Sequence, residues 1–542
     1  MIPHCRHPET GIQYLLQLQN KFGPRNYRQH FVDVALISTY IMAREQWQSQ
    51  IGFVLAAVGS AIGLGNIWRF SYMAYKHGGG AFLIPYILAL LSVGIPLLIL
   101  EFAIGHERIG SAPLAFRKIN KKWEWLGWWS VSFVMFGIVL YYITIISWCL
   151  NYFIKSLSLD WGNDPNRYFF TQFLAVSKSP FEIKGIVTPV FTGVAFIWFI
   201  NWAIVYRGVK KGLELANKIF MPLLLVLTAM LVFWSLTLGG AGVGIKAYLK
   251  PDFTMLAKPR IWIDAFSQIF FTLSLGFGIM IAYASYLPEK ANLTRGAYVT
   301  ALINCGYSLF AGFAVFSVLG FMAVSQGREI SEVVSESIGL AFVAYPKALS
   351  IMPGGNIFGA VFFFCLVVAG VSSSISIIEA FTSAVVDKFG ISRKTFVTVL
   401  CILGFIGSII FTTHAGLFWL DITDHFLTHY GLLIVAIAEC LLVGWLFNIK
   451  IMRHHINRIS SIKVGAGWEF FIKVFIPAVL LILLSIDFYN ELSKPYGGYS
   501  WTAVVLIGIV WLLINLVMAF ILAARPWKTE NHKAKGRGEI HE

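Results

Sequence analysis

The chain has 542 residues, of which 57% are hydrophobic and 13% are charged, and its mean hydropathy is +0.72. This composition is far too apolar for a soluble globular protein and predicts a polytopic membrane protein. The formal net charge of +15 could indicate nucleic-acid binding, but the basic residues gather between alternate apolar runs, as the positive-inside rule describes. We therefore expect a bilayer partner and no nucleic acid.

Residues 1–41 are polar and mixed, unlike the rest of the chain. They lack a charged segment followed by a long apolar core and a small-residue cleavage site, so they do not resemble a signal peptide. The segment MAREQWQSQIG, from Met42, has the character of a natural beginning. Residues 1–41 are expected to be a disordered cytoplasmic tail, or to precede a functional start near Met42; the intact mass of the native protein distinguishes these alternatives.

Apolar runs long enough to cross a hydrocarbon core of about 30 Å as helices recur along the remaining chain. They are continuous rather than alternating, which favours helices over strands. The predicted fold class is therefore an all-α polytopic membrane protein with about twelve transmembrane helices. The expected spans are residues 51–76, 81–104, 127–155, 188–206, 217–238, 261–287, 297–324, 354–386, 396–412, 419–447, 469–487 and 501–524.

The basic residues orient these spans in the membrane. Both termini are predicted to be cytoplasmic, in a cell membrane (plasma or inner), with residues 527–542 as a polar cytoplasmic tail. The basic residues that fall in cytoplasmic segments include Arg117, Lys118, Lys121, Lys122, Arg207, Lys210, Lys211, Arg453 and Arg458.

Two classes of chemistry find no support in the residue pattern. Five of the six cysteines fall within predicted spans and none falls in residues 156–187, so no disulfide is expected in that outer connection. No cysteine pair has metal-ligand spacing, and the HER at His106 lacks the second histidine of a zinc protease motif. We expect no enzymatic activity.

The first span reads IGFVLAAVGSAIGLGNIWRF and carries glycines at 59, 63 and 65. Glycine weakens a helix by roughly 1 kcal/mol relative to alanine, although small residues also serve close helix packing. The sixth span is interrupted in the same way at residues 274–278. Two broken spans five positions apart predict repeated halves, residues 42–240 (spans 1–5) and 255–449 (spans 6–10), followed by spans 11 and 12 in residues 464–526.

A broken membrane helix has a definite chemical use. Its freed carbonyls can coordinate cations, and the amino terminus of the continuing half presents unpaired N–H groups to an anion. Such groups must line a cavity, because lipid cannot satisfy them.

At these residues the sequence resembles the neurotransmitter:sodium symporter family, sodium-coupled carriers that include the bacterial leucine transporter. GSAIGLGNIWRF and KHGGGAFLIPYILALLSVGIPLLILEFAIG carry the resemblance first, followed by LYYITIISW, QIFFTLSLGFG, YASY, ALINCGYS, GLAFVAYP and AGVSSSIS. The resemblance covers roughly residues 42–450, in order. It implies the leucine-transporter (LeuT-type) fold, with a 5+5 inverted repeat and unwound helices 1 and 6, and sodium-coupled symport by alternating access.

The resemblance also implies two sodium ions beside one substrate. Their ligands would be oxygen atoms, which suit a hard cation stripped of water. A triple serine such as residues 372–374 would otherwise be read as helix packing. The first site would use Ala61, Asn66, Thr272 and Asn304, with a substrate carboxylate oxygen; the second would use Gly59, Ile62, Ala369, Ser372 and Ser373.

The implied substrate is a neutral aliphatic or aromatic amino acid. Family members that carry monoamines hold an aspartate where this chain has Gly63. Without that charge, the amides of Leu64 and Gly65 with the Tyr142 hydroxyl can receive a carboxylate. The implied substrate-binding residues are Ala61, Leu64, Gly65, Ile138, Tyr142, Phe271, Thr272, Ser274, Phe277, Ser373 and Ile377.

The seventh span points to chloride. Chloride-independent bacterial relatives place a carboxylate where this chain has Ser308. The resemblance implies that chloride supplies the missing charge, although Ser308 could merely pack while another carboxylate supplies it. The implied chloride ligands are Tyr86, Gln268, Thr272, Asn304 and Ser308.

Breakable ion pairs are implied at both ends of the path. Arg69 would close the outer side with Asp424, and Arg44 would close the inner side with Asp387, aided by Tyr286. Taken alone, Arg69 would more often be a snorkelling interfacial residue. Alternative functions are carriage of another small osmolyte or of an amine, and a non-transporting sensor with the same fold.

Overall fold

A computed structural model describes residues 45–333 and 337–528 of the chain. Residues 1–41, Arg44 and most of the predicted tail lie outside the described residues. Within the described part the protein is built from helices, and the β-structure found there is one isolated bridge between Ile186 and Thr413. The prediction of an all-α membrane protein is confirmed.

Ten described helices are long and apolar enough to cross a membrane. A further bent pair, Gln50–Ala61 with Leu64–Lys76, qualifies as one broken span with a bend of 71°. The ten are Gly79–Arg108, Lys121–Ser156, Thr188–Val205, Val209–Leu236, Leu293–Gln326, Gly355–Phe389, Arg393–Thr412, Gly416–Leu446, Ala466–Gly498 and Trp501–Ala524.

The predicted sixth span is present as two short helices, α14 (Pro259–Thr272) and α15 (Ile279–Ala284), with an unwound stretch between them. Apart from the first span, which is the bent pair, each of the other predicted spans coincides with one helix, often a longer one. The third, for example, begins at Lys121 rather than at residue 127 because a 3-10 turn over Lys121–Trp123 precedes its α-helical part.

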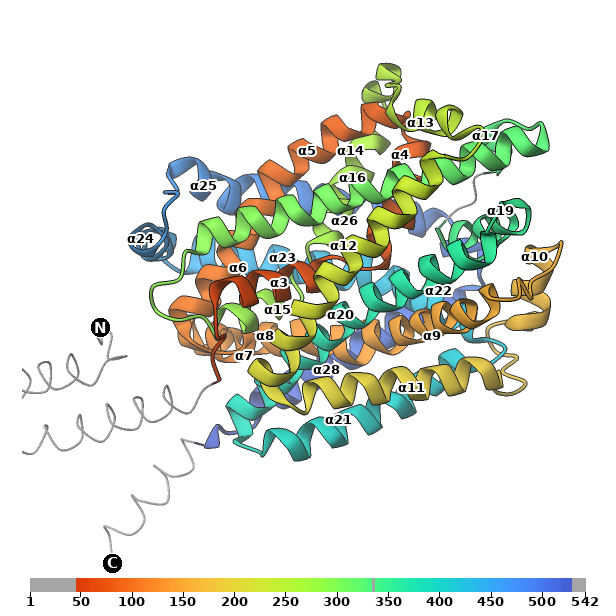
Figure 1. Ribbon diagram of the computed structural model, residues 1–542. Helices are drawn as coiled ribbons and strands as arrows, with labels where there is room; N and C mark the ends of the chain where they lie inside the picture. The colour runs from red at the N-terminus through yellow and green to blue at the C-terminus, as the bar shows by residue number, and fades with distance from the viewer. Residues whose placement is uncertain (1–44, 334–336, 529–542) are drawn as a thin grey trace, which may run out of the picture.

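The helices are named by the labels of Figure 1. Around the first break lie α3 (Gln50–Ala61) and α4 (Trp68–Lys76). The others are α5 (Leu83–Ala89), α6 (Ile95–Arg108), α7 (Ala112–Ile119), α8 (Glu124–Phe133), α9 (Val139–Ser156), α10 (Pro165–Arg167), α11 (Thr188–Val205), α12 (Leu215–Leu236), α13 (Ala241–Leu249), α16 (Leu293–Gln326), α17 (Ile330–Val333), α19 (Tyr345–Ile351), α20 (Gly355–Phe389), α21 (Arg393–Ser408), α22 (Gly416–Phe426), α23 (Leu432–Leu441), α24 (Ile449–Ile459), α25 (Ala466–Phe470), α26 (Ile476–Ser493), α27 (Trp501–Ala503) and α28 (Val510–Ala524).

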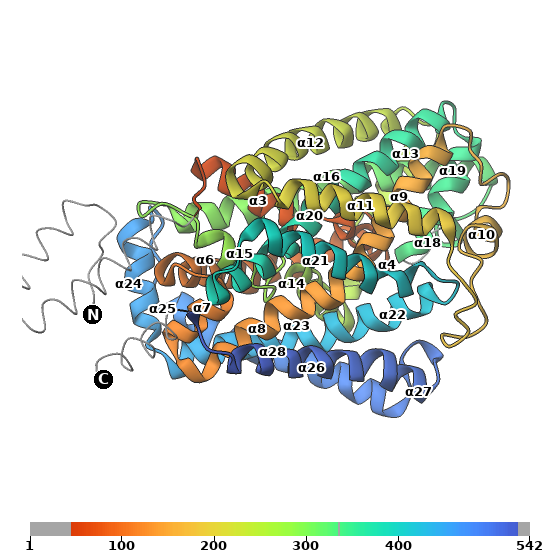
Figure 2. The same cartoon turned by 90° about the horizontal axis from the view of Figure 1, so that it is seen from below.

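The long helices run side by side between two distinct ends (Figures 1 and 2). At one end, here called the terminal end, the described chain begins and finishes and α24 lies across the bundle. The opposite end carries α10, α13 and α19. α3 packs against α12, α16 and α20, so the first half of the broken span is held at the centre.

Burial ranks the helices from centre to periphery. The apolar window of Gly355–Phe389 is 89% buried within the protein, whereas those of the last two spans are 28% buried. Apolar side chains on the outer helices, such as Phe233, Ile514 and Val517, are exposed. In a membrane protein this exposed apolar surface faces lipid, and the central helices are left to form the site.

Candidate ion and substrate site

The chain breaks between α3 and α4 because two amide groups leave the helical ladder. In a continuous helix the amides of Gly63 and Leu64 would donate to the carbonyls of Gly59 and Ser60. Here the Gly63 amide donates to Asn66 Oδ1 at 2.8 Å, and the Leu64 amide donates to the Tyr142 hydroxyl at 3.3 Å. The last carbonyls of α3 are therefore free for other partners.

Serine hydroxyls of α20 form hydrogen bonds with carbonyls at the end of α3. Ser372 Oγ donates to the Gly59 and Ala369 carbonyls, both at 2.8 Å. Ser373 Oγ lies 3.2 Å from the Ile62 carbonyl. These are the five residues predicted for the second sodium site, and the structure brings them together as a cluster of hydroxyl and carbonyl oxygens. Such oxygens are the ligands that a hard cation requires.

The sixth span unwinds through left-handed residues. Ser274, Gly276 and Gly278 have φ angles of 54°, 77° and 69°, which end the helix and turn the chain. The Gly276 amide donates to Glu101 Oε1 on α6 at 2.7 Å. Ser274 Oγ donates to the Ser60 carbonyl at 3.2 Å, which joins the two breaks directly. No role for Glu101 was predicted, and its carboxylate accepts from an amide of the unwound stretch.

Of the four residues predicted for the first sodium site, three are joined by hydrogen bonds. Asn66 Nδ2 donates to Asn304 Oδ1 at 2.9 Å, and Asn304 Nδ2 donates to Thr272 Oγ1 at 3.2 Å. Ala61, the last residue of α3, is buried beside the cavity described below. Each amide oxygen keeps a second lone pair, so it can coordinate a cation while accepting its present hydrogen bond.

Next to this cluster lies a set of buried polar groups that lack partners. Both amide atoms of Gln268 have no hydrogen-bond partner among the described residues, and the Tyr86 hydroxyl lies near Ser308 and Cys305 without a well-formed hydrogen bond. Ser308 Oγ accepts from Asn66 Nδ2 at 2.9 Å. Leaving a buried donor unsatisfied costs about 1–3 kcal/mol, so several together indicate that something else binds here. Hydroxyl and amide donors of this kind are groups that can bind an anion.

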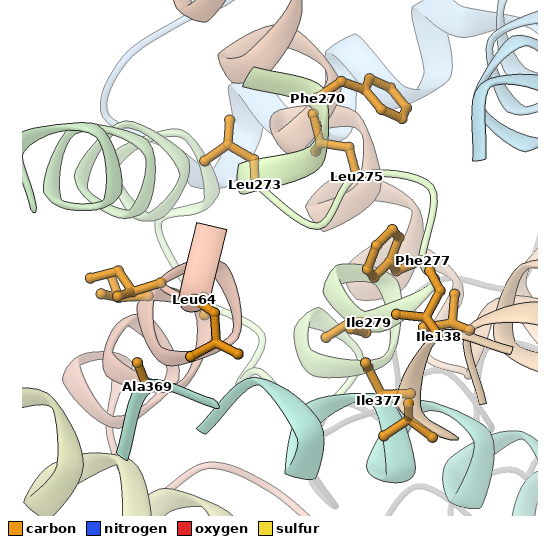
Figure 3. Close-up of a cluster of buried hydrophobic side chains, with 14 of the residues drawn as sticks. Leu64, Ile138, Phe270, Leu273, Leu275, Phe277, Ile279, Ala369 and Ile377 are labelled. Atoms are coloured by element: carbon orange, nitrogen blue, oxygen red, sulfur yellow. The ribbon is translucent and has the colours of Figure 1, made fainter. Parts of the chain in front are cut away.

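A cavity of about 810 Å³ reaches from these clusters toward the opposite end of the bundle. The apolar side chains of Phe277, Ile138 and Ile377 gather at its inner part (Figure 3). All the residues predicted to bind substrate line it: Ala61, Leu64, Gly65, Ile138, Tyr142, Phe271, Thr272, Ser274, Phe277, Ser373 and Ile377.

The two residues of the predicted outer gate lie in the cavity wall but do not form an ion pair. Arg69 and Asp424 both line the cavity, and no ion pair joins them in the described part of the chain. The Arg69 guanidinium carbon lies 4.9 Å from the centroid of the Phe271 ring. The Tyr141 hydroxyl donates to Asp424. The carboxylate thus has a partner other than the predicted arginine while the cavity is open.

At the terminal end the path is closed. Trp47 is buried, its indole Nε1 donates to the Tyr283 carbonyl at 2.8 Å, and its ring packs edge-on against Tyr286. Of the predicted inner gate, Arg44 lies outside the described residues, and Asp387 accepts from the Ser111 amide at 2.8 Å.

Tyr286, the third member of the predicted inner gate, donates to Glu379 Oε1 at 2.8 Å. Glu379 is ion-paired with Arg393 at the start of α21. The sequence placed Tyr286 with Asp387 and gave Glu379 no role, so this buried pair is a finding of the structure.

The Tyr141 contact makes a testable prediction about opening. Tyr141→Phe removes the donor to Asp424 and leaves that carboxylate free for Arg69, which should favour closure of the cavity mouth. A hydrogen bond to a charged group contributes about 1.5–3 kcal/mol, so accessibility of the mouth should fall about tenfold or more. The rate at which a thiol reagent modifies a cysteine introduced at Thr428, in the cavity wall, measures this accessibility. Tyr142→Phe, which removes the neighbouring hydroxyl, is the comparison variant.

The cavity mouth carries a group of polar side chains that was not predicted. His425 pairs with Glu491, and His429 Nδ1 lies 2.8 Å from Asp487 Oδ2. The two histidines are four residues apart on one span and the two carboxylates are four apart on another. That spacing places each pair on one helix face, but nothing in the sequence shows that the faces meet.

Comparison with known proteins gives a consistent picture. The model of the sodium:neurotransmitter symporter family matches residues 44–168 and 162–529. An uncharacterised sodium-dependent transporter of Methanocaldococcus jannaschii is 51% identical over 482 residues, which cover 89% of this chain and 98% of that protein. A sodium-dependent dopamine transporter of Caenorhabditis elegans is 30% identical, with 87% and 85% covered. The human sodium- and chloride-dependent taurine transporter is 31% identical, with 90% and 85% covered.

Proposed function

The chain belongs to the sodium:neurotransmitter symporter family, and from that premise we propose that it carries a neutral amino acid across the cell membrane together with sodium. It is a multi-pass, sodium-dependent transporter and not an enzyme. The observation that carries the finer proposal is the first break, where Gly63 lies next to the hydroxyls of Tyr142 and Ser373. We propose that both termini lie in the cytoplasm, because the distribution of basic residues supports this orientation.

Gly63 argues against an amine as the substrate. A Cβ atom added there would lie 2.9 Å from the Tyr142 hydroxyl and 3.2 Å from Ser373 Oγ, so a side chain at this position would have to displace both. Because residue 63 is glycine, the protein has no carboxylate at this position to meet an amine. The hydroxyl and amide donors left there suit a carboxylate.

The inner part of the cavity wall supports a substrate with a neutral side chain. Ile138, Phe271, Phe277 and Ile377 are apolar, and Ser373 is the polar residue predicted among them. A charged substrate side chain in this inner part would lose its hydration without gaining a partner. Aliphatic and aromatic amino acids therefore fit best.

Two sodium ions would supply the driving force. Moving two charges down a potential of 100 mV yields about 4.6 kcal/mol, which sustains roughly a thousandfold accumulation of a zwitterion at 1.4 kcal/mol per tenfold. Chloride carried together with them would subtract the share of one charge. The unpartnered Tyr86 and Gln268 groups support such an anion beside the first sodium.

The runner-up substrate is another small zwitterion or an amine. Relatives named as transporters of taurine, GABA and dopamine are about 30–31% identical to this chain. A cavity of about 810 Å³ has room for a longer zwitterion, whose anionic end would use the same donors. A non-transporting sensor would bind the same solutes without moving them.

The deciding experiment is uptake into proteoliposomes of a pool of the twenty amino acids with taurine, GABA and dopamine added. An imposed sodium gradient drives uptake, and mass spectrometry identifies the solutes that accumulate. We expect one or a few neutral amino acids to accumulate only with sodium. Accumulation of an amine or osmolyte alone would overturn the substrate assignment, and sodium-dependent binding without uptake would indicate a sensor.

The second sodium site makes a separate prediction. Ser372→Ala removes a hydroxyl that lies 2.8 Å from the Gly59 carbonyl, and so removes one sodium ligand. Loss of one bond to a charged group costs about 1.5–3 kcal/mol, so the sodium concentration for half-maximal uptake should rise about tenfold or more. Ser374→Ala, which affects a hydroxyl directed at Asn201, is the matched control and should leave this concentration unchanged.

A further inference from the structure

The fifth span holds the first half of the broken first span through two glycines. α12 and the turn before it pack against α3, and polar side chains fill the places that Cβ atoms of α3 would take. A Cβ at Gly52 would lie 2.2 Å from Glu214 Oε1, and a Cβ at Gly59 would lie 2.1 Å from Asn217 Oδ1. Both distances are far shorter than any real contact, so the glycines are required for this packing.

Asn217 is an unusual group to find there. Its side chain is fully buried, and its Nδ2 donates to the Leu213 carbonyl at 2.9 Å. Its Oδ1 has no hydrogen-bond partner among the described residues. A carbonyl oxygen buried without a donor is costly, and here it lies directly against the Cα of Gly59. Weak Cα–H···O contacts of this kind recur where helices approach closely.

Gly59 is also the residue whose carbonyl is freed by the break. That carbonyl accepts from Ser372 Oγ at 2.8 Å on the α20 side, while Asn217 borders the same residue on the α12 side. The Gly59 peptide is therefore fixed from two directions. Without Asn217, a cavity would open behind it and the peptide could rotate.

We propose that Asn217 is a positioning residue for the second sodium site, where it holds the Gly59 carbonyl toward Ser372. This inference rests on the proposed function, because it presumes that sodium binds these oxygens. Asn217 does not itself touch the ion; it acts by fixing the orientation of a ligand.

The same face of the fifth span also holds the beginning of α3. Glu214 Oε2 accepts from the Gln48 amide at 2.8 Å, and Glu214 Oε1 lies 3.4 Å from Ser49 Oγ. Asn217 bonds back to Leu213, the residue before Glu214. Sodium at Gly59 would therefore stabilise the packing of all of α3 against α12, which is the arrangement in which the terminal end is closed.

The test measures sodium binding without requiring transport. Purified full-length protein is titrated with sodium and with lithium, and the ion concentration that gives half of the maximal rise in melting temperature is recorded. Asn217→Ala should raise the half-saturating sodium concentration about tenfold and reduce the discrimination between sodium and lithium. Asn217→Asp, which keeps the shape and places an anion nearby, should lower the half-saturating concentration instead.

Two further variants separate positioning from general damage. Thr228→Ala removes another buried polar group of α12, a hydroxyl that contacts Tyr307 rather than the first span. This variant should leave both ion titrations unchanged. Gly59→Ala should abolish the sodium response, because its Cβ would meet Asn217 Oδ1. Adding Asn217→Ala to Gly59→Ala removes that atom and should restore a response.

The outcomes distinguish the two hypotheses. If wild-type protein responds to sodium and Asn217→Ala responds identically in affinity and selectivity, the positioning role is wrong while the proposed function stands. A wild-type melting temperature that sodium does not change would count against the proposed function itself. Failure of Asn217→Ala to restore a response to Gly59→Ala would show that Asn217 is not what excludes a side chain there.

Discussion

Replacement of Gly63 by aspartate should lower uptake of the amino acid at least about a hundredfold. The new Cβ would lie 2.9 Å from the Tyr142 hydroxyl, and the carboxylate beyond it would enter the space proposed for the substrate carboxylate. Two carboxylates in the same buried space repel each other strongly because both are negatively charged. Sodium-driven uptake of the substrate identified from the pool measures the loss.

The aspartate should also change what the site prefers. The decarboxylated amine of the same substrate carries no anion to be repelled and can pair with the new carboxylate. We expect this amine to bind to Gly63→Asp better than to the wild-type protein, as measured by sodium-dependent protection from thermal unfolding.

Gly63→Ala is the comparison that separates crowding from charge. Its methyl group meets only the end of the Tyr142 side chain and Ser373 Oγ, both of which can move by a few tenths of an ångström. Uptake by Gly63→Ala should therefore fall less than uptake by Gly63→Asp. Equal loss in the two variants, with no gain for the amine, would contradict the placement of the carboxylate at Gly63.

The positions of both breaks could be predicted from the sequence because they depend on local chemistry. Glycines at 59, 63 and 65 weaken one apolar run, and residues 274–278 weaken another. The second break proves to contain the left-handed residues Ser274, Gly276 and Gly278. A local preference that is this strong survives tertiary packing, and so the elements and their interruptions were predictable.

The partners of buried side chains were not predictable in the same way. Glu101 and Gly276 are 175 residues apart, and Asn217 and Gly59 are 158 residues apart, so only packing of distant helices brings them together. The predicted pair of Arg69 and Asp424 illustrates a second limit. A breakable ion pair forms in one conformation and not in another. In this structure, with the cavity open, the Tyr141 hydroxyl donates to the Asp424 carboxylate instead.

Within the site, hydrogen bonding explains why the broken span needs polar neighbours. Amides that leave the ladder donate to side-chain oxygens: that of Gly63 donates to Asn66, and that of Gly276 donates to Glu101. The freed carbonyl of Gly59 accepts from the hydroxyl of Ser372. Polar groups at membrane depth persist only when they are satisfied in this way or when they bind a ligand. Gln268, whose two amide atoms have no partner among the described residues, and the neighbouring Tyr86 hydroxyl are therefore the groups that we propose bind a ligand.

If that missing ligand is chloride, Ser308→Glu should make transport independent of it. Ser308 Oγ lies 2.9 Å from Asn66 Nδ2, within the cluster predicted for the first sodium. A carboxylate on this side chain would supply the negative charge that chloride otherwise provides beside that sodium. Replacing chloride by gluconate should lower wild-type uptake about tenfold or more and leave uptake by Ser308→Glu nearly unchanged.

Ser308→Gln is the matched control, because glutamine has the size of glutamate without its charge. This variant should keep the chloride requirement, and a chloride-independent Ser308→Gln would show that filling the space, rather than charge, is what matters. If gluconate leaves wild-type uptake unchanged, another carboxylate supplies the charge and Ser308 merely packs. If wild-type uptake needs chloride and Ser308→Glu needs it equally, the anion binds elsewhere, and the unsatisfied groups of Tyr86 and Gln268 require a different partner.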